Sequence, residues 1–211
     1  MAIVDPVTFK YLALPNGLAG RGGAVRFFLL AARVPYKEDL VDFAEWRAGV
    51  KQEVKDSGES PLGVLPVITV GSKRLIQHVA TTRYLAKAQG LYGKDIDADL
   101  AADGVADEYV PWREAWVASL GGDDAKATYA SARPKYYAGL EALLGYYGST
   151  GASATAGGAL TYADALLFSQ IWDDTTTQGL DLLQSHQRLL AFFTAFKALP
   201  AISEYLGASK A

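Results

Sequence analysis

The sequence contains 211 residues, half of them hydrophobic, with a formal net charge of −3 and no cysteine. This length suits one large domain or two small ones with a substantial core. The acidic balance argues against nucleic-acid binding, which needs a concentrated basic face. The lack of cysteine excludes disulfides, thiolate metal sites and a protein thiol nucleophile.

A metal site, a membrane-spanning helix and a signal peptide are not expected either. The two histidines, His78 and His186, are far apart in the sequence, so we expect no metal site. No run of apolar residues reaches the length of about eighteen that a membrane-spanning helix needs. The N-terminus lacks the charged-then-apolar layout of a signal peptide. We therefore expect a cytoplasmic protein without a membrane partner.

The first 90 residues mix strand and helix signals, which is typical of a small α/β domain. In chain order we expect a strand at residues 9–14, a helix at 22–34, a strand at 36–43, a short helical stretch at 44–57, a hairpin at 67–76 and a helix at 78–90. Gly90 is a typical residue for the end of that helix.

Strand signals disappear after Gly93. Helical stretches are predicted at residues 95–120, 124–148, 160–179, 186–199 and 200–207, with a loop of small residues at 149–159. Pro111 and Pro134 lie inside the first two stretches and predict a kink or a break in each. Thr161 and Asp164 form a capping box, which is a structural feature. The sequence thus predicts an α/β domain at residues 1–90 and an all-helical domain at 91–211.

A glycine-rich segment, PNGLAGRGGAVR, occupies residues 15–26 between the first strand and the first helix. A phosphate-binding P-loop needs a Lys followed by Ser or Thr, and both are missing here. The dinucleotide pattern also fails, because Val25 stands where the third glycine is needed. An alternative is that these glycines bind no ligand and only permit a tight turn of the backbone.

Four segments in series resemble the cytosolic glutathione transferases, nearest their alpha, mu, pi and sigma branches. These segments are NGLAGRGGAVRFFLLAARVPY, VLPVITVGSKRLIQHVATTRYLA, GLYGKD and LTYADALL. The resemblance implies a thioredoxin-like N-terminal domain followed by a helical C-terminal domain. It also implies a homodimer that uses glutathione as co-substrate, without a metal.

The resemblance assigns most glutathione-binding residues to the first domain. It implies a cis bond at Leu65–Pro66 and free backbone groups at Leu65, which could pair with an extended peptide. Gln77 matches the glutamine that holds the γ-glutamyl group. His78 replaces the usual serine at this helix start, where backbone N–H groups favour an anion.

The remaining contacts to glutathione are expected at its two ends. Trp46 and Lys51 match a Trp and a Lys near the glycine carboxylate, and Arg47 could substitute for Lys51. Asp103 or Asp107, and preferably Asp107, could reach the glutamyl amine across the dimer.

The residue that activates the thiol has three candidates. The near branches use a Tyr at the end of the first strand, but the matching position holds no Tyr. Tyr11 lies farther upstream and could serve, or could be a core aromatic. Alternatively Asn16 and Arg21, with the N–H groups of the loop, could stabilise the thiolate.

These patterns predict a transferase that activates the thiol of bound glutathione. The thiolate would attack, or assist the isomerisation of, a small apolar electrophile, or would reduce a peroxide. An aromatic pocket for the electrophile is expected from Tyr109, Trp112 and Trp116, with Trp172 also a candidate. The alternative is a non-catalytic carrier or interaction module that keeps the fold.

Overall fold

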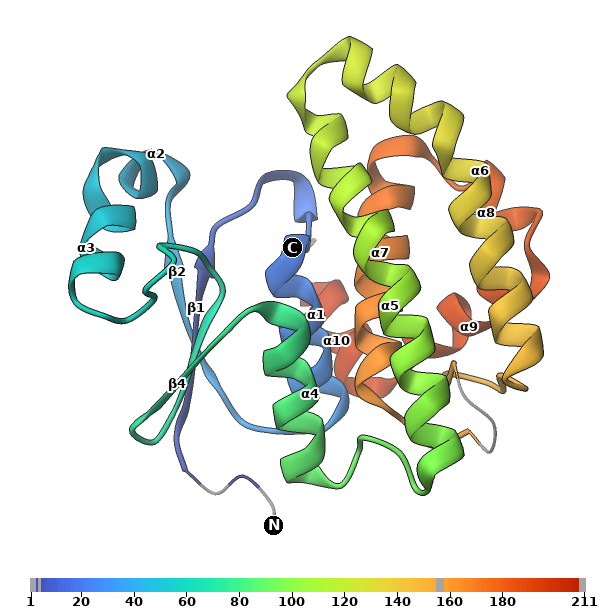
Figure 1. Cartoon of the computed structure of the whole chain (residues 1–211), viewed down its shortest axis with the longest axis horizontal. Coiled ribbons are helices and arrows are strands. Elements are labelled where there is room, and N and C mark those ends of the chain that lie inside the picture. The colour runs from blue at the N-terminus through green and yellow to red at the C-terminus, as the bar shows by residue number, and fades with distance from the viewer. Residues whose placement is uncertain (1–2, 4, 155–157, 209–211) are drawn as a thin grey trace.

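The computed structural model describes residues 3, 5–154 and 158–208. Figure 1 shows a half that contains a sheet beside a half made of helices. The strands of the first half are β1 (Val7–Leu12), β2 (Lys37–Val41), β3 (Val67–Val70) and β4 (Lys73–Ile76). Its helices are η1 (Pro15–Gly17), α1 (Gly20–Ala31), α2 (Phe43–Glu45), η2 (Trp46–Val50), α3 (Lys51–Asp56) and α4 (His78–Gln89).

The sheet has the order β2-β1-β3-β4. β1 runs parallel to β2 and antiparallel to β3, and the hairpin expected at residues 67–76 forms β3 and β4. Side chains alternate along β1, so that Phe9 and Tyr11 are buried on the face that α1 covers. This βαβ–ββα order is the predicted thioredoxin-like arrangement.

The second half contains α5 (Ile96–Ala118), η3 (Ser119–Gly121), α6 (Asp123–Tyr146), α7 (Tyr162–Gln178), α8 (Asp181–Gln184), α9 (Gln187–Lys197) and α10 (Pro200–Ala208). α5 and α6 continue through Pro111 and Pro134, so neither helix is broken. A proline removes one backbone hydrogen bond, and both helices are held by packing, α5 against α6 and α7. The capping box of Thr161 and Asp164 is present at the start of α7, as predicted.

The two halves share one continuous core. α1 packs along α7, and the Phe27 ring meets the Phe168 ring edge-on with centroids 4.9 Å apart. Phe168 also stacks on Phe193 and Phe196 of α9. The position of α1 is therefore set by the helical half as well as by the sheet.

Among the described residues, no single helix is long and apolar enough to cross a membrane. α9 and α10 together reach the required length and composition, but they are bent by 78° at their junction. Phe192, Phe196 and Ile202 of this pair are buried in the protein core.

Candidate active site

A pocket of about 460 Å³ lies where the end of β1 meets the starts of α1 and α4; we call it the β1–α4 pocket. Seven residues that the sequence singled out line it: Tyr11, Arg21, Trp46, Lys51, Leu65, Gln77 and His78. Leu12, Gly63, Val64 and Glu114 complete the lining. The fold thus gathers residues from six separate segments around one cavity.

One wall of the pocket is an open backbone edge. The Leu65–Pro66 peptide bond is cis, as the resemblance implied. Among the described residues, neither the N–H nor the C=O of Leu65 takes part in a backbone hydrogen bond. The adjacent Val64 N–H is held by the Ser60 hydroxyl at 3.1 Å. Leu65 can therefore pair with an extended peptide in the manner of an added strand.

The start of α4 forms a second wall. Gln77 precedes the helix with a φ of 68°, an uncommon value for a residue with a side chain. No side chain caps the helix, so its first N–H groups are available to a ligand. A helix of this length with a free N-terminus favours a carboxylate.

His78 is the first residue of α4 and is largely withdrawn from solvent. Burial, together with the nearby cations Arg113 and Arg21, lowers its pKa to about 3. Its Nε2 atom is buried without a hydrogen-bond partner among the described residues, and its ring lies edge-on to Tyr109. The side chain is therefore neutral at neutral pH and adds no positive charge to the anion site.

Tyr11 lines the pocket and is only 6% exposed. Its ring packs against the first turn of α1, so closely that an ideal Cβ on Gly22 would lie 2.5 Å from ring carbons. Burial raises the pKa of Tyr11, while the Gly22 backbone N–H and the Arg113 guanidinium oppose this rise. Tyr11 is thus both a core aromatic and part of the pocket wall.

Arg21 extends from the same turn of α1 toward the helical half. Its Nη2 atom donates to both carboxylate oxygens of Glu114 on α5, at 2.8 Å each. Both side chains are partly exposed and both line the pocket. No sequence pattern points to Glu114 at this site, because only the packing of α5 on the first half brings it here.

The N–H groups at the start of α1 already have an internal partner. Asp173 of α7 accepts the Ala19 N–H at 2.6 Å and the Gly20 N–H at 2.8 Å. Asp173 also pairs with Arg113 of α5 at 2.5 Å, and both side chains are fully buried. These two loop N–H groups are therefore engaged within the protein rather than open to a thiolate.

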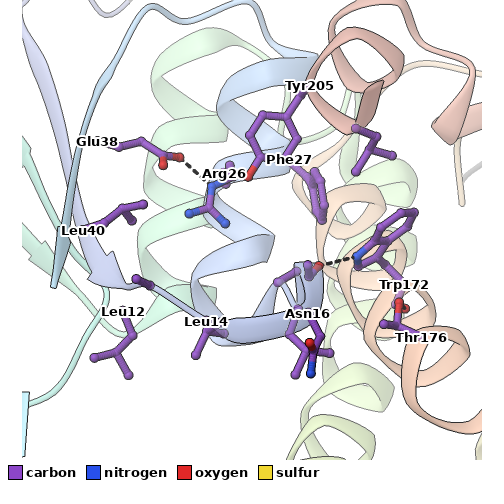
Figure 2. Close-up of a pocket in the computed structure, with 15 residues that line it drawn as sticks. Leu12, Leu14, Asn16, Arg26, Phe27, Glu38, Leu40, Trp172, Thr176 and Tyr205 are labelled. Atoms are coloured by element: carbon purple, nitrogen blue, oxygen red, sulfur yellow. Dashed lines mark hydrogen bonds and ion pairs between the residues drawn. The ribbon is translucent and has the colours of Figure 1, made fainter. Parts of the chain in front are cut away.

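Asn16 does not line the β1–α4 pocket. It borders a neighbouring cavity of about 590 Å³, which we call the loop cavity (Figure 2). The two cavities share Leu12, on either side of the β1–α1 connection. Asn16 has a φ of 56° and turns away with this connection, so the structure separates it from Arg21.

The expectation that Tyr109, Trp112 and Trp116 form an open aromatic pocket is not met. All three are at most 2% exposed and line neither cavity. Trp112 Nε1 donates to the Tyr129 hydroxyl at 2.7 Å, and Trp116 Nε1 donates to Thr177 Oγ1 at 3.1 Å. These rings are core because the aromatic face of α5 turns toward α6 and α7.

Trp172 does line the loop cavity. Its Nε1 atom donates to the Gly17 carbonyl at 2.9 Å, a bond drawn as a dashed line in Figure 2. Leu12, Leu14, Leu40 and Phe27 provide apolar walls, with Arg26 held against Glu38 at 2.6 Å on one side. This cavity has the apolar character expected of a site for a small hydrophobic molecule.

Asp103 and Asp107, the two α5 acids considered for the glutamyl amine, differ in their surroundings. Asp103 is held by the hydroxyls of Tyr162 and Tyr92 and by Arg83 at 3.2 Å, and these partners lower its pKa. Asp107 is exposed on the same helix. Arg47, the possible substitute for Lys51, lies over the Phe43 ring and does not line the pocket.

Comparisons with known proteins agree with this architecture. Residues 111–209 match the family model for the glutathione S-transferase C-terminal domain. Glutathione S-transferase 4 of Caenorhabditis elegans is 24% identical over 194 residues, covering 88% of this chain and 90% of its own length. Hematopoietic prostaglandin D synthase of Gallus gallus is 26% identical over 204 residues, covering 90% and 91%.

The fold is also that of solved structures. A major nematode-specific glutathione transferase of C. elegans superposes with a TM-score of 0.79 at 22% identity, covering 97% of each chain. A thioredoxin-like half joined to a helical half defines the class of protein. The family-model match and the sequence relatives together support the cytosolic glutathione transferase family for this chain.

Proposed function

We propose that the β1–α4 pocket binds glutathione. The observation that carries this proposal is the meeting of the free Leu65 backbone, the uncapped start of α4 and the pair Trp46 and Lys51 around one cavity. The cysteine backbone would pair with Leu65 and the γ-glutamyl carboxylate would lie at the N-terminus of α4. The glycine carboxylate would then lie near Lys51, and the thiol near Leu12 and Arg21.

We further propose that the protein is an enzyme that activates this thiol for attack on a small apolar electrophile. The loop cavity would hold the electrophile, since it adjoins the thiol end of the pocket at Leu12. Conjugation, glutathione-assisted isomerisation and peroxide reduction all begin from the same thiolate. A turnover assay with a generic aryl halide, an isomerisable ketone and an organic peroxide distinguishes them.

Glutathione binding is tested by calorimetry on the wild type and on Gln77→Ala. We expect the variant to bind at least several-fold more weakly, because Gln77 borders the anion site at the start of α4. Gln184→Ala is the matched control, since this glutamine is exposed on α8 far along the chain. Equal affinity in all three proteins would place glutathione elsewhere.

A non-catalytic carrier is the second candidate function. It is favoured by the burial of Tyr11 against α1 and by the use of the Ala19 and Gly20 N–H groups within the protein. Because Tyr11 and these N–H groups are already engaged within the protein, Arg21 is the main remaining candidate for stabilising a thiolate. Glutathione binding without turnover of any of the three substrate classes would support the carrier.

Two organisational features belong to the same proposal. We place the domain boundary at residues 90 and 91, because Gly90, with a φ of 68°, directly follows the last residue of α4 and α5 begins at Ile96. We also propose a homodimer, in which exposed Asp107 could reach the partner's ligand. Exposed Ile96 and Leu100 on the same helix support an apolar contact surface. Sedimentation analysis would test the dimer directly.

A further inference from the structure

The charges around the thiol end of the β1–α4 pocket come from four elements. Arg113 of α5 is fully buried, but Asp173 matches its charge at 2.5 Å. Lys51 of α3 lies on the pocket wall, and Tyr11 and His78 complete the titratable groups that face this region. The charges that remain closest to the reacting end are Arg21 and Glu114.

Glu114 is the only acid among the described residues that line this pocket. Its two oxygens accept from a single nitrogen of Arg21, at 2.8 Å each, and the pair joins the two halves of the protein across the cavity. The backbone next to Arg21 cannot shift easily, since Asp173 holds the Ala19 and Gly20 N–H groups. The position of the Arg21 guanidinium is therefore set by its side-chain partner.

We propose that Glu114 is a positioning residue that retains the Arg21 guanidinium and thereby limits how strongly Arg21 stabilises the thiolate of bound glutathione. This rests on the proposed function. A guanidinium with a carboxylate counter-ion presents a smaller net field to a neighbouring anion than a free guanidinium does. Glu114 thus sets the thiol pKa through Arg21.

The first experiment follows thiolate absorbance during pH titration of the glutathione complex. Glu114→Gln keeps the shape of the side chain but removes its charge, so we expect the thiol pKa to fall by about half to one unit. Glu108→Gln is the control, because Glu108 is exposed on the same helix and lines neither cavity. A thiol pKa that is unchanged or raised in Glu114→Gln would overturn the proposal.

A double-mutant cycle shows whether Glu114 acts through Arg21. We expect Arg21→Ala to raise the thiol pKa, and Glu114→Gln to have little further effect in the Arg21→Ala background. A full effect of Glu114→Gln without Arg21 would mean that Glu114 acts directly on the thiol, which contradicts the positioning role.

A second reporter keeps the inference testable if glutathione binds elsewhere. The chain has no cysteine, so Leu12→Cys introduces a single thiol at the same end of the pocket. Its pKa follows from the pH dependence of alkylation by iodoacetamide, without glutathione. We expect Glu114→Gln to lower this pKa as well. A shift of the reporter without glutathione binding would reject the proposed function alone, whereas an unmoved reporter in a folded protein would reject the inference.

Discussion

Asp173 and Gly20 lie 153 positions apart in the sequence, yet Asp173 Oδ2 accepts the Gly20 N–H at 2.8 Å. This bond, with its neighbour at Ala19, means that a carboxylate of the helical half caps the first helix of the thioredoxin-like half. The same carboxylate neutralises buried Arg113. One side chain therefore fixes the turn that carries Arg21 and couples the two halves.

Asp173→Asn should strongly destabilise the protein. The substitution leaves Arg113 buried without a counter-charge, a change that typically costs about 3–5 kcal/mol. The free energy of unfolding from urea denaturation measures this loss. Asp181→Asn, at an exposed position, should change it by less than about 0.5 kcal/mol. Similar values for both variants would show that the buried pair is not needed for stability.

Gly22→Ala should also be destabilising, because the new methyl group would meet the Tyr11 ring at 2.5 Å. Overpacking of this kind typically costs about 1–3 kcal/mol. Gly139→Ala is the matched control: nothing lies within 4 Å of its added methyl, and it is exposed inside α6. We expect that variant to gain about 0.5–1 kcal/mol from helix propensity. Thermal unfolding of the pair should therefore show shifts of opposite sign.

His78 should make the protein less stable as the pH falls. Its pKa is about 3 in the folded state, against an ordinary value of 6.5, so between these values the unfolded state binds more protons. The contribution of His78 to stability is thus fully present above pH about 6.5 and is lost as the pH decreases toward 3. In His78→Asn, the free energy of unfolding should fall less steeply between pH 6.5 and 4.5 than in the wild type. Parallel slopes would contradict a buried, neutral histidine.

Tyr11→Phe should have a smaller effect on the thiol of bound glutathione than Arg21→Ala. The Tyr11 hydroxyl faces the first turn of α1, whereas the Arg21 side chain lies along the pocket. We expect the thiol pKa to change by less than about half a unit in Tyr11→Phe and to rise by about one unit in Arg21→Ala. Ultraviolet titration of the thiolate compares the two variants. The reverse order would identify Tyr11 as the hydroxyl donor.

Trp172→Leu should impair use of a bulky aromatic electrophile without changing glutathione affinity, because Trp172 lines the loop cavity and not the β1–α4 pocket. Steady-state kinetics should show a higher KM for the electrophile, and calorimetry an unchanged Kd for glutathione. Trp112→Phe is the comparison for a core tryptophan. It should lose about 2 kcal/mol of stability with little change in that KM.

Local sequence features predicted much of the architecture. Hydrophobic periodicity indicated the strands and helices, Gly90 the end of α4, and Thr161 with Asp164 the start of α7. These features depend on interactions between residues a few positions apart, so the sequence alone determines them. The first strand ended two residues earlier than expected, at Leu12, because pairing with β2 and β3 decides where a strand ends.

Only the tertiary structure decided which side chains meet around the candidate site. Tyr109, Trp112 and Trp116 share α5 with Glu114, yet the first three are buried and only Glu114 reaches the pocket. α5 also carries exposed Ile96 and Leu100, so its hydrophobic pattern does not identify the face that packs inward. The rotation of α5 about its axis is fixed by its packing on α6 and α7. The partner of Gly20 is likewise fixed by the docking of α7, over 150 residues away in the chain.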